Sequence, residues 1–198
     1  MVCLVAALGC FAMALRSAEH RHLVPFAAPV PLTDSSATPE DGPAQMSSAL
    51  GTNPPVRVVI PAVGLSARVV PVGLTRTGHM KMPHPSAAGW YRWGPTPGAV
   101  GPSVLVGHVD SYHGPAVFYR LSGVRRGETV QVVRADGSTT GFAISKITVV
   151  SEADFPSLAV FGRTPRAAIR LITCTGPFDS SSGYADSLIV WGHKIRQR

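Results

Sequence analysis

Residues 129–150 read TVQVVRADGSTTGFAISKITVV and set the class of fold. Two runs rich in Val, Ile and Thr flank Asp136-Gly137, a dipeptide typical of tight β-hairpin turns. Similar runs recur between turn signals along the chain, namely Val56 to Ile60, Ala67 to Val70, Ser103 to Val106, Ala168 to Thr173 and Leu188 to Trp191. No segment keeps a long apolar period of 3.6 residues, so helices of only one or two turns are expected, near 116–121 and 152–158. The sequence predicts an all-β domain folded as a closed barrel.

Composition divides the 198 residues into three parts. Residues 1–22 contain an apolar run over 2–15, which is shorter than the roughly 20 residues of a membrane-spanning helix. That run predicts either the core of an export signal or part of a membrane anchor. Residues 23–55 are rich in Pro, Ala and Ser without periodicity, which indicates a linker. We expect residues 56–198 to form one folded domain.

The charge and the cysteines narrow the class of function. The formal charge is +7 with a pI near 9.9, but the basic residues are scattered singly along the chain. Nucleic-acid binding proteins gather such residues on one helix or arm, so a solvated basic surface is expected and no nucleic-acid partner. Cys3 and Cys10 lie in the apolar run, which leaves Cys174 as the single cysteine of the predicted domain. An unpaired thiol outside the cytoplasm suggests a chemical role.

Cys174 and His108 are the candidate pair for that chemistry. Each follows an apolar run, Cys174 in LITCTG and His108 in SVLVGH, and each run leads into a loop containing glycine. If the two strands are adjacent and run the same way, their ends bring the thiol and the imidazole to one rim of the barrel. An imidazole there can stabilise a thiolate and give a proton to a leaving amine. The loop around Thr175 and Gly176 argues against burial of the thiol.

The chain also resembles a known family over residues 56 to 192. The strings that carry the resemblance occur in order; they are IPAVGL at 60–65, GWY at 89–91, GHVDS at 107–111, AVFYRL at 116–121, LITCTGPFD at 171–179 and YADS at 184–187. They are similar to those of the sortases, cysteine transpeptidases of Gram-positive cell surfaces, and most of all to class F sortases of actinobacteria.

This resemblance implies an eight-stranded sortase barrel with one or two short helices. It implies that Cys174 attacks a carbonyl of an LPXTG-like sorting signal and that His108 protonates the departing amine. Thr173, Thr175, Gly176 and Asp110 are then candidates for substrate binding. The acyl-enzyme would pass the protein to an amine of a peptidoglycan precursor. No cofactor and no metal are implied, and the location implied is the outside of the cytoplasmic membrane, secreted or anchored there.

The sequence departs from the sortase pattern at one point. Sortases carry an arginine near the start of the strand after the cysteine loop, whereas GYADS at 183–187 contains no basic residue. Three explanations stay open. Backbone N–H groups of Thr175 and Gly176 stabilise the oxyanion alone, or Arg92 or Arg170 reaches in, or the chain is a weak or inactive relative that only binds sorting signals. Loss of one oxyanion donor costs about 10²- to 10³-fold in rate.

The remaining histidines and the tryptophans do not indicate a specific binding or catalytic site. His79, His84 and His113 lack the compact spacing of metal ligands and are expected on loops. Trp90 and Trp93 are equally compatible with core packing and with a substrate groove.

Overall fold

The structure is a computed structural model that describes residues 53–76, 78–181 and 183–196. Eight strands close into a barrel in the order β1-β2-β3-β4-β9-β10-β8-β7. Their bounds are β1 Pro55–Ile60, β2 Leu65–Val72, β3 Ala87–Tyr91, β4 Gly101–Val106, β7 Thr129–Arg134, β8 Thr139–Ser151, β9 Ala167–Asp179 and β10 Gly183–Lys194. A two-stranded hairpin of β5 (Asp110–Ser111) and β6 (Gly114–Pro115) lies beside the barrel. The predicted closed barrel of eight strands is confirmed.

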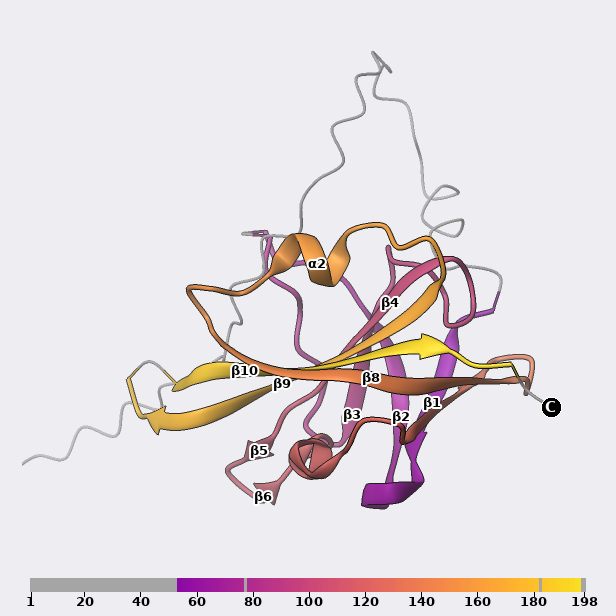
Figure 1. Cartoon of the computed structure of the whole chain (residues 1–198). Coiled ribbons are helices and arrows are strands. Elements are labelled where there is room, and N and C mark those ends of the chain that lie inside the picture. The colour runs from indigo at the N-terminus through magenta and orange to yellow at the C-terminus, as the bar shows by residue number, and fades with distance from the viewer. Residues whose placement is uncertain (1–52, 77, 182, 197–198) are drawn as a thin grey trace, which may run out of the picture.

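Three short helices occur in the described part of the chain. Two are 3₁₀ helices, η1 (Pro61–Val63) and η2 (Tyr119–Gly123), and one is α-helical, α2 (Ser157–Phe161). In Figure 1 α2 lies on the loop that joins β8 to β9 and runs along one side of the barrel. The predicted helices near 116–121 and 152–158 therefore exist, but each begins several residues later than expected. Pro156 is the N-cap of α2, and a proline disfavours helical backbone in the residue before it.

Strands β4 and β9 lie side by side and run in the same direction. Their register pairs Gly101 with Ala167 and continues to Val106 with Ile172, a constant difference of 66 residues. Most other neighbouring strands are antiparallel, and β8, β9 and β10 form the long ribbon across the front of Figure 1. The parallel pair matters for function because parallel strands bring their carboxyl ends to the same edge.

Two apolar clusters occupy the two faces of this sheet. The barrel interior holds fully buried Trp90, Leu105 and Leu171 together with the other residues of the larger cluster. The outer face holds a second cluster that includes Val106, Ile172 and Ile189, covered by Val160 of α2. Alternate residues of β9 point to opposite faces, so Leu171 belongs to the interior and Ile172 to the outer cluster. Trp90 is a core residue, whereas the side chain of Trp93 is 47% exposed.

Strand β9 is longer than predicted. The expected strand ends before Cys174, but pairing with β10 continues to Asp179, across Gly176 and Pro177. The pairing of β9 with β4 ends at Ile172. Beyond Ile172, β9 is an edge strand on the side that faced β4. A proline is tolerated on an edge strand because the N–H that it lacks has no strand partner there. Cys174 therefore lies within a strand and not in a loop.

The predicted turn at Asp136-Gly137 joins β7 to β8 as expected. Gly137 has φ 82°, a left-handed conformation that glycine adopts without steric cost. The Asp136 backbone N–H donates to the Asn53 side chain, and Pro54 accepts from Ala135, so the described chain contacts this turn before β1 begins.

The expected signal or anchor at 1–22 and most of the expected linker at 23–55 lie outside the described residues. Among the residues described, no helix is both long and apolar enough to span a bilayer.

Candidate active site

The register of β4 and β9 brings the strand ends that precede His108 and Cys174 to one edge of the sheet. Each residue lies two positions after the last residue of the parallel pairing, and they differ by the same 66 positions. The Gly107 N–H donates to the Ile172 carbonyl at 3.1 Å, which extends the ladder one residue beyond β4. Neighbouring strands are about 4.8 Å apart, so the strand ends that precede His108 and Cys174 lie in adjacent rows. The structure thus brings together the ends of the two strands that carry the predicted pair.

His108 is held by contacts on both sides of its backbone. A Cβ on Gly107 would lie 2.7 Å from side-chain atoms of Val117 and Phe118, so only glycine allows this close approach. The Phe118 N–H donates to the His108 carbonyl at 2.9 Å. The imidazole Nε2 is 3.1 Å from the Pro83 carbonyl oxygen. Because a carbonyl only accepts, Nε2 carries the hydrogen in this bond.

Cys174 is half-buried on the outer face of β9, and it is the free cysteine of the described residues. Burial, and then the negative charges of Glu152 and Asp110, raise the pKa of its thiol to about 11. Both desolvation and a nearby carboxylate disfavour a thiolate. The thiol is therefore protonated at neutral pH in this state.

A hydrogen bond between Asp110 and Tyr184 joins β5 to the start of β10. The Tyr184 hydroxyl donates to the Asp110 carboxylate, linking β10 to β5 just after His108. This bond raises the pKa of Tyr184 to about 12, and the Cys174 thiolate contributes to the same shift. Asp110, Tyr184 and Cys174 are thus close enough for their charges to interact. The Tyr184 ring also packs edge to face on Phe178, with ring centroids 5.1 Å apart.

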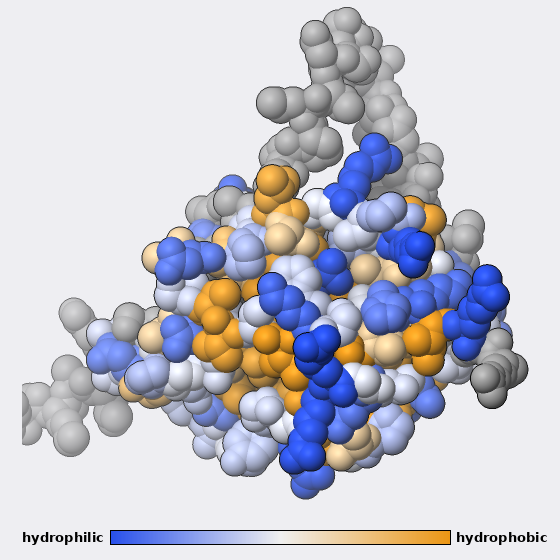
Figure 2. All heavy atoms as spheres, viewed as in Figure 1, coloured by the Kyte–Doolittle hydropathy of each residue, from blue (hydrophilic) through white to orange (hydrophobic). Residues whose placement is uncertain are grey.

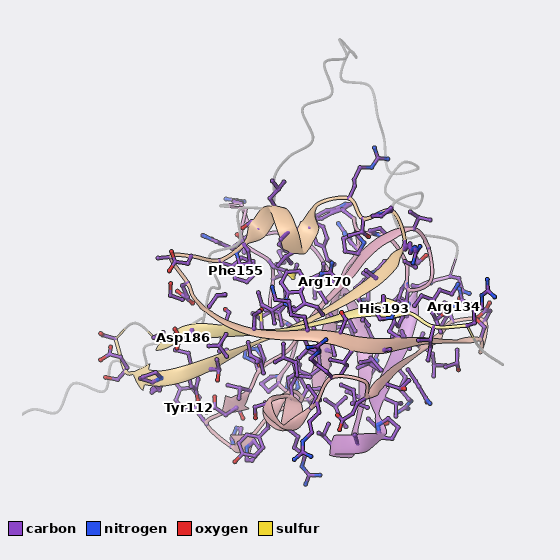
Figure 3. All side chains as sticks on the ribbon, in the orientation of Figure 1. Tyr112, Arg134, Phe155, Arg170, Asp186 and His193 are labelled. Atoms are coloured by element: carbon purple, nitrogen blue, oxygen red, sulfur yellow. The ribbon has the colours of Figure 1, made fainter. Side chains whose placement is uncertain are left out.

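Glu152 is a site residue that sequence reasoning missed. It follows β8 directly, and its N–H donates to the Ala185 carbonyl of β10 at 3.2 Å. The pairing of β8 with β10 is what brings it near the thiol, and no local sequence feature of Glu152 signals this. Phe155 and Asp186, labelled in Figure 3, mark the same end of the β8–β10 ribbon.

The other predicted binding residues are placed less favourably. Thr173 is 4% exposed and lies on the opposite face of β9 from Cys174 by strand alternation, so the structure does not bring its side chain into the site. Thr175 is half-buried and alternates to that same face, and Gly176 is exposed with φ 83°. A Cβ on Gly176 would collide with the Asp186 carboxylate. Among the four, Asp110 is the residue whose charge raises the pKa of the Cys174 thiol.

A comparison with known protein families identifies the family of this chain. The sortase-domain family profile matches residues 58–195. The chain belongs to the sortase family. No curated protein matches it.

Solved structures of sortases share its fold. Sortase C1 from Streptococcus suis has 20% identity and a TM-score of 0.60, covering 78% of this chain and 79% of the other. Sortase C2 of Group B Streptococcus pilus island 1 has 23% identity and a TM-score of 0.55, with 71% and 73% covered. Sortase A of Listeria monocytogenes has 18% identity and a TM-score of 0.54, with 72% and 88% covered. These structures belong to classes C and A.

The sortase arginine has no counterpart at the expected position. Ala185 is exposed there, at a bulge where the β9–β10 register shifts between Tyr184 and Asp186. Arg92 and Arg170 each stack on a tryptophan, with guanidinium carbons 4.6 Å from the Trp93 ring and 4.5 Å from the Trp191 ring. The charged groups that shift the thiol pKa are both acidic.

No cluster of metal-ligating side chains occurs within the described residues. His84 Nδ1 is 2.9 Å from the Ser86 hydroxyl, and the His113 N–H donates to Ser111 at 3.2 Å. Both histidines are exposed, on loops.

Proposed function

We propose that this sortase is a cysteine transpeptidase that cleaves an LPXTG-like sorting signal and transfers the protein to an amine of a cell-wall precursor. The observation that carries the proposal is the 66-residue offset of the parallel β4–β9 pairing, which equals the separation of His108 and Cys174 and supports their action as a pair. Membership of the sortase family supports the reaction class.

The proposed reaction has two balanced steps. The Cys174 sulfur attacks the carbonyl carbon of the threonine in the signal, a C–S bond forms and the C–N bond to the following glycine breaks. His108 takes the thiol proton and gives it to the departing amine, which leaves a thioester. An incoming amine then attacks the thioester carbonyl, a C–N bond forms and the C–S bond breaks, and the proton of the amine returns through His108 to the sulfur.

The hydrogen bond from Nε2 of His108 to the Pro83 carbonyl supports different roles for its two nitrogens. In the proposed mechanism Nε2 keeps this bond, and Nδ1 takes up and releases the proton. Because the thiol is neutral at rest, the reactive thiolate forms only as the proton moves to His108. This arrangement favours a slow enzyme, and the absent arginine points the same way.

The finer assignments rest on the sequence. The GHVDS, LITCTGPFD and YADS strings favour a class F-like sortase. The apolar N-terminal run favours a protein held at or exported through the membrane, with sorting-signal proteins and a peptidoglycan-precursor amine as its partners.

The test is transpeptidation by the full-length protein. Incubation with an LPXTG-type peptide and a small amine such as triglycine should yield the peptide–amine product. Cys174→Ala should abolish it, and His108→Ala should reduce it by at least about 10²-fold, the range of general acid–base catalysis. An unchanged rate in Cys174→Ala would rule out the mechanism.

A second function is favoured by the electrostatics of the thiol. With Glu152 and Asp110 beside it and no arginine at the expected position, the barrel could bind sorting signals without cleaving them. A thiol-reactive peptide mimic distinguishes the two. Labelling of Cys174 supports catalysis, whereas measurable binding of the peptide with no label on Cys174 supports a binder.

A further inference from the structure

A second concave site lies on the β8–β10 ribbon, apart from Cys174. It is a cavity of about 290 Å³ whose walls come from β8, β10 and the start of β9. In Figure 3 Arg170 and His193, which line it, lie along the ribbon away from the end marked by Asp186. Arg170 is four residues before Cys174, about 13 Å along a strand, and Ile172 of the outer apolar cluster lies between them. The cavity is therefore separate from the candidate active site.

Arg170 is a buried cation without a counterion among the described residues. It is 8% exposed, and its Nε has no hydrogen-bond partner. One terminal nitrogen donates to the Ile169 carbonyl at 3.0 Å, and the guanidinium carbon lies 4.5 Å from the centre of the Trp191 ring. Burial lowers the pKa of Arg170 to about 10, so the guanidinium carries its charge at neutral pH. A buried charge of this kind is costly unless a partner compensates it.

The rest of the lining has the same sign of charge. Lys146, Arg166 and His193 also line the cavity, and none of its described lining residues is acidic. The Lys146 ammonium lies 5.6 Å from the Trp191 ring, so two cations lie against one indole. The Trp191 ring is itself fixed, since its N–H donates to the Thr148 hydroxyl at 2.8 Å. The cavity is therefore a preorganised concentration of positive charge.

The acidic residues gather at the other end of the ribbon. Most of those described lie near Cys174 or beyond it, on the side away from the cavity; they are Asp110, Glu152, Asp154, Asp179 and Asp186. The others, Glu128 and Asp136, accept from backbone N–H groups close to them in sequence. Figure 2 shows strongly hydrophilic and hydrophobic residues side by side on the face that carries the ribbon. Compensation of Arg170 therefore requires an anion from outside the described domain.

The arrangement of the donors favours a phosphate group over a carboxylate. Arg170, Lys146 and His193 come from three different strands, β9, β8 and β10, so they approach an anion from several directions. A carboxylate has its oxygens in one plane, which a single guanidinium fork can occupy, whereas a phosphate ester offers acceptor oxygens in several directions. An apolar wall completes the cavity and consists of Pro165, Ala167 and Ala168. This wall and the volume leave room for the carbon group that the phosphate esterifies.

We propose that the cavity binds the phosphate group of an organic phosphoester, with Arg170 as its buried anchor and Lys146, Arg166 and His193 around it. The site is independent of the chemistry at Cys174, so the proposal does not rest on the proposed transpeptidase reaction. Two sources present this chemistry, the headgroup of an anionic lipid and a soluble phosphodiester polymer. Binding of either would hold the protein by a part of the ribbon away from the thiol.

The first experiment measures the Kd of glycerol phosphate for the full-length protein by isothermal titration calorimetry. Glycerol phosphate is a small ester that contains the chemistry of both sources. At an ionic strength of about 0.15 M, charges more than about 8 Å apart are largely screened, which suppresses general attraction to a basic protein. Glycerol phosphate should bind at least about tenfold more tightly than glycerate, a carboxylate of similar kind, because it makes more charge-assisted hydrogen bonds. Cys174→Ala should have the same Kd as the wild type.

Substitutions locate the effect. Arg170→Gln should weaken the binding of glycerol phosphate at least about tenfold, and Arg170→Lys, which keeps the charge without the fork, should be intermediate. Arg68→Gln, at an exposed site on β2, removes the same charge elsewhere and should leave the Kd unchanged. If Arg170→Gln does not fold, Lys146→Gln at the exposed rim should weaken binding about threefold or more.

Two further measurements separate the sources. Wild type and Arg170→Gln, which share the same N-terminal apolar run, are compared for co-sedimentation with vesicles of phosphatidylglycerol in phosphatidylcholine and for binding to a soluble oligomer of glycerol phosphate. A loss of vesicle binding in Arg170→Gln supports the proposal with a lipid headgroup as the ligand. A loss confined to the soluble oligomer supports it with a polymer as the ligand.

The proposal would be overturned if the wild type did not bind glycerol phosphate, or bound glycerate equally well. The same Kd in Arg170→Gln, or an equal loss in Arg68→Gln, would also overturn it. Turnover of an LPXTG-type peptide is measured separately and distinguishes this result from the proposed function. Phosphoester binding without turnover rejects the transpeptidase and keeps the cavity site, and turnover without phosphoester binding does the reverse.

Discussion

The Tyr184 hydroxyl donates to the Asp110 carboxylate, and this bond joins the β9–β10 hairpin to the segment that follows His108. It ties the two halves of the site together and spreads the negative charge of a carboxylate near the thiol. In Tyr184→Phe, Asp110 should disfavour the thiolate more strongly. We expect the rate of Cys174 alkylation at pH 8 to fall about threefold or more. The rate is measured by mass spectrometry of the peptide that contains Cys174.

Stability separates this electrostatic role from a structural one. The bond is near the surface, so its loss should lower Tm by at most about 4 °C. A large loss of Tm with an unchanged alkylation rate would show that Tyr184 serves the fold alone.

The raised pKa of Cys174 predicts an unusual pH dependence of its reactivity. Because the thiol pKa is about 11, the rate of alkylation by iodoacetamide should rise about tenfold per pH unit from 8 to 10. Glu152→Gln combined with Asp110→Asn removes two negative charges and should lower the thiol pKa. Glu128→Gln, whose carboxylate accepts from the Arg125 N–H, is the control. An alkylation rate of the wild type that stops rising near pH 8.5, the ordinary cysteine pKa, would contradict this prediction.

Ala185 is the position at which an arginine should improve the enzyme. It is exposed, and it lies two residues from Ser187, the β10 partner of Cys174. A guanidinium there would offset Glu152 and Asp110 and supply an oxyanion donor. We expect Ala185→Arg to raise the rate of acyl-enzyme formation at least about tenfold. Ala185→Gln, which adds length without charge, should give little gain, and equal gains from both would argue against a charge effect.

Gly107 controls the position of His108 through close packing. A Cβ there must displace Val117 or Phe118, and Phe118 is fully buried. Gly107→Ala should lower kcat/KM at least about tenfold, because a small displacement of a catalytic group is costly. Gly123→Ala, where the nearest atom would be 3.5 Å from the new Cβ, should leave kcat/KM unchanged. An active Gly107→Ala would show that the strand end tolerates movement.

The sequence predicts most of the barrel because its strands follow simple apolar patterns. Strand β3 is the exception: its residues, AAGWY, include two alanines and a glycine, which have low strand propensity. Its neighbours hold it in place, since it pairs in parallel with β2 and antiparallel with β4. The extension of β9 past Cys174 was also missed, because Gly176 and Pro177 read as a turn.

The candidate site is predictable only where strand order determines it. The meeting of the two strand ends that precede His108 and Cys174 follows once β4 and β9 are neighbours in parallel, which the sequence indicates through two similar strand ends. Glu152 and Arg170 differ in this respect. The first reaches the thiol region through the pairing of β8 with β10, and the second is oriented by stacking on Trp191. Contacts of this kind depend on tertiary packing and have no local pattern.

The acyl-enzyme on Cys174 is tested most directly by intact-mass analysis of the full-length protein after incubation with an LPXTG-type peptide in the absence of an added amine. The proposed mechanism predicts a mass increase equal to the acyl fragment, mapped by peptide analysis to Cys174 and not to Cys3 or Cys10, and absent in Cys174→Ala. An adduct that persists in Cys174→Ala would contradict it, as would product formation with no thioester on Cys174.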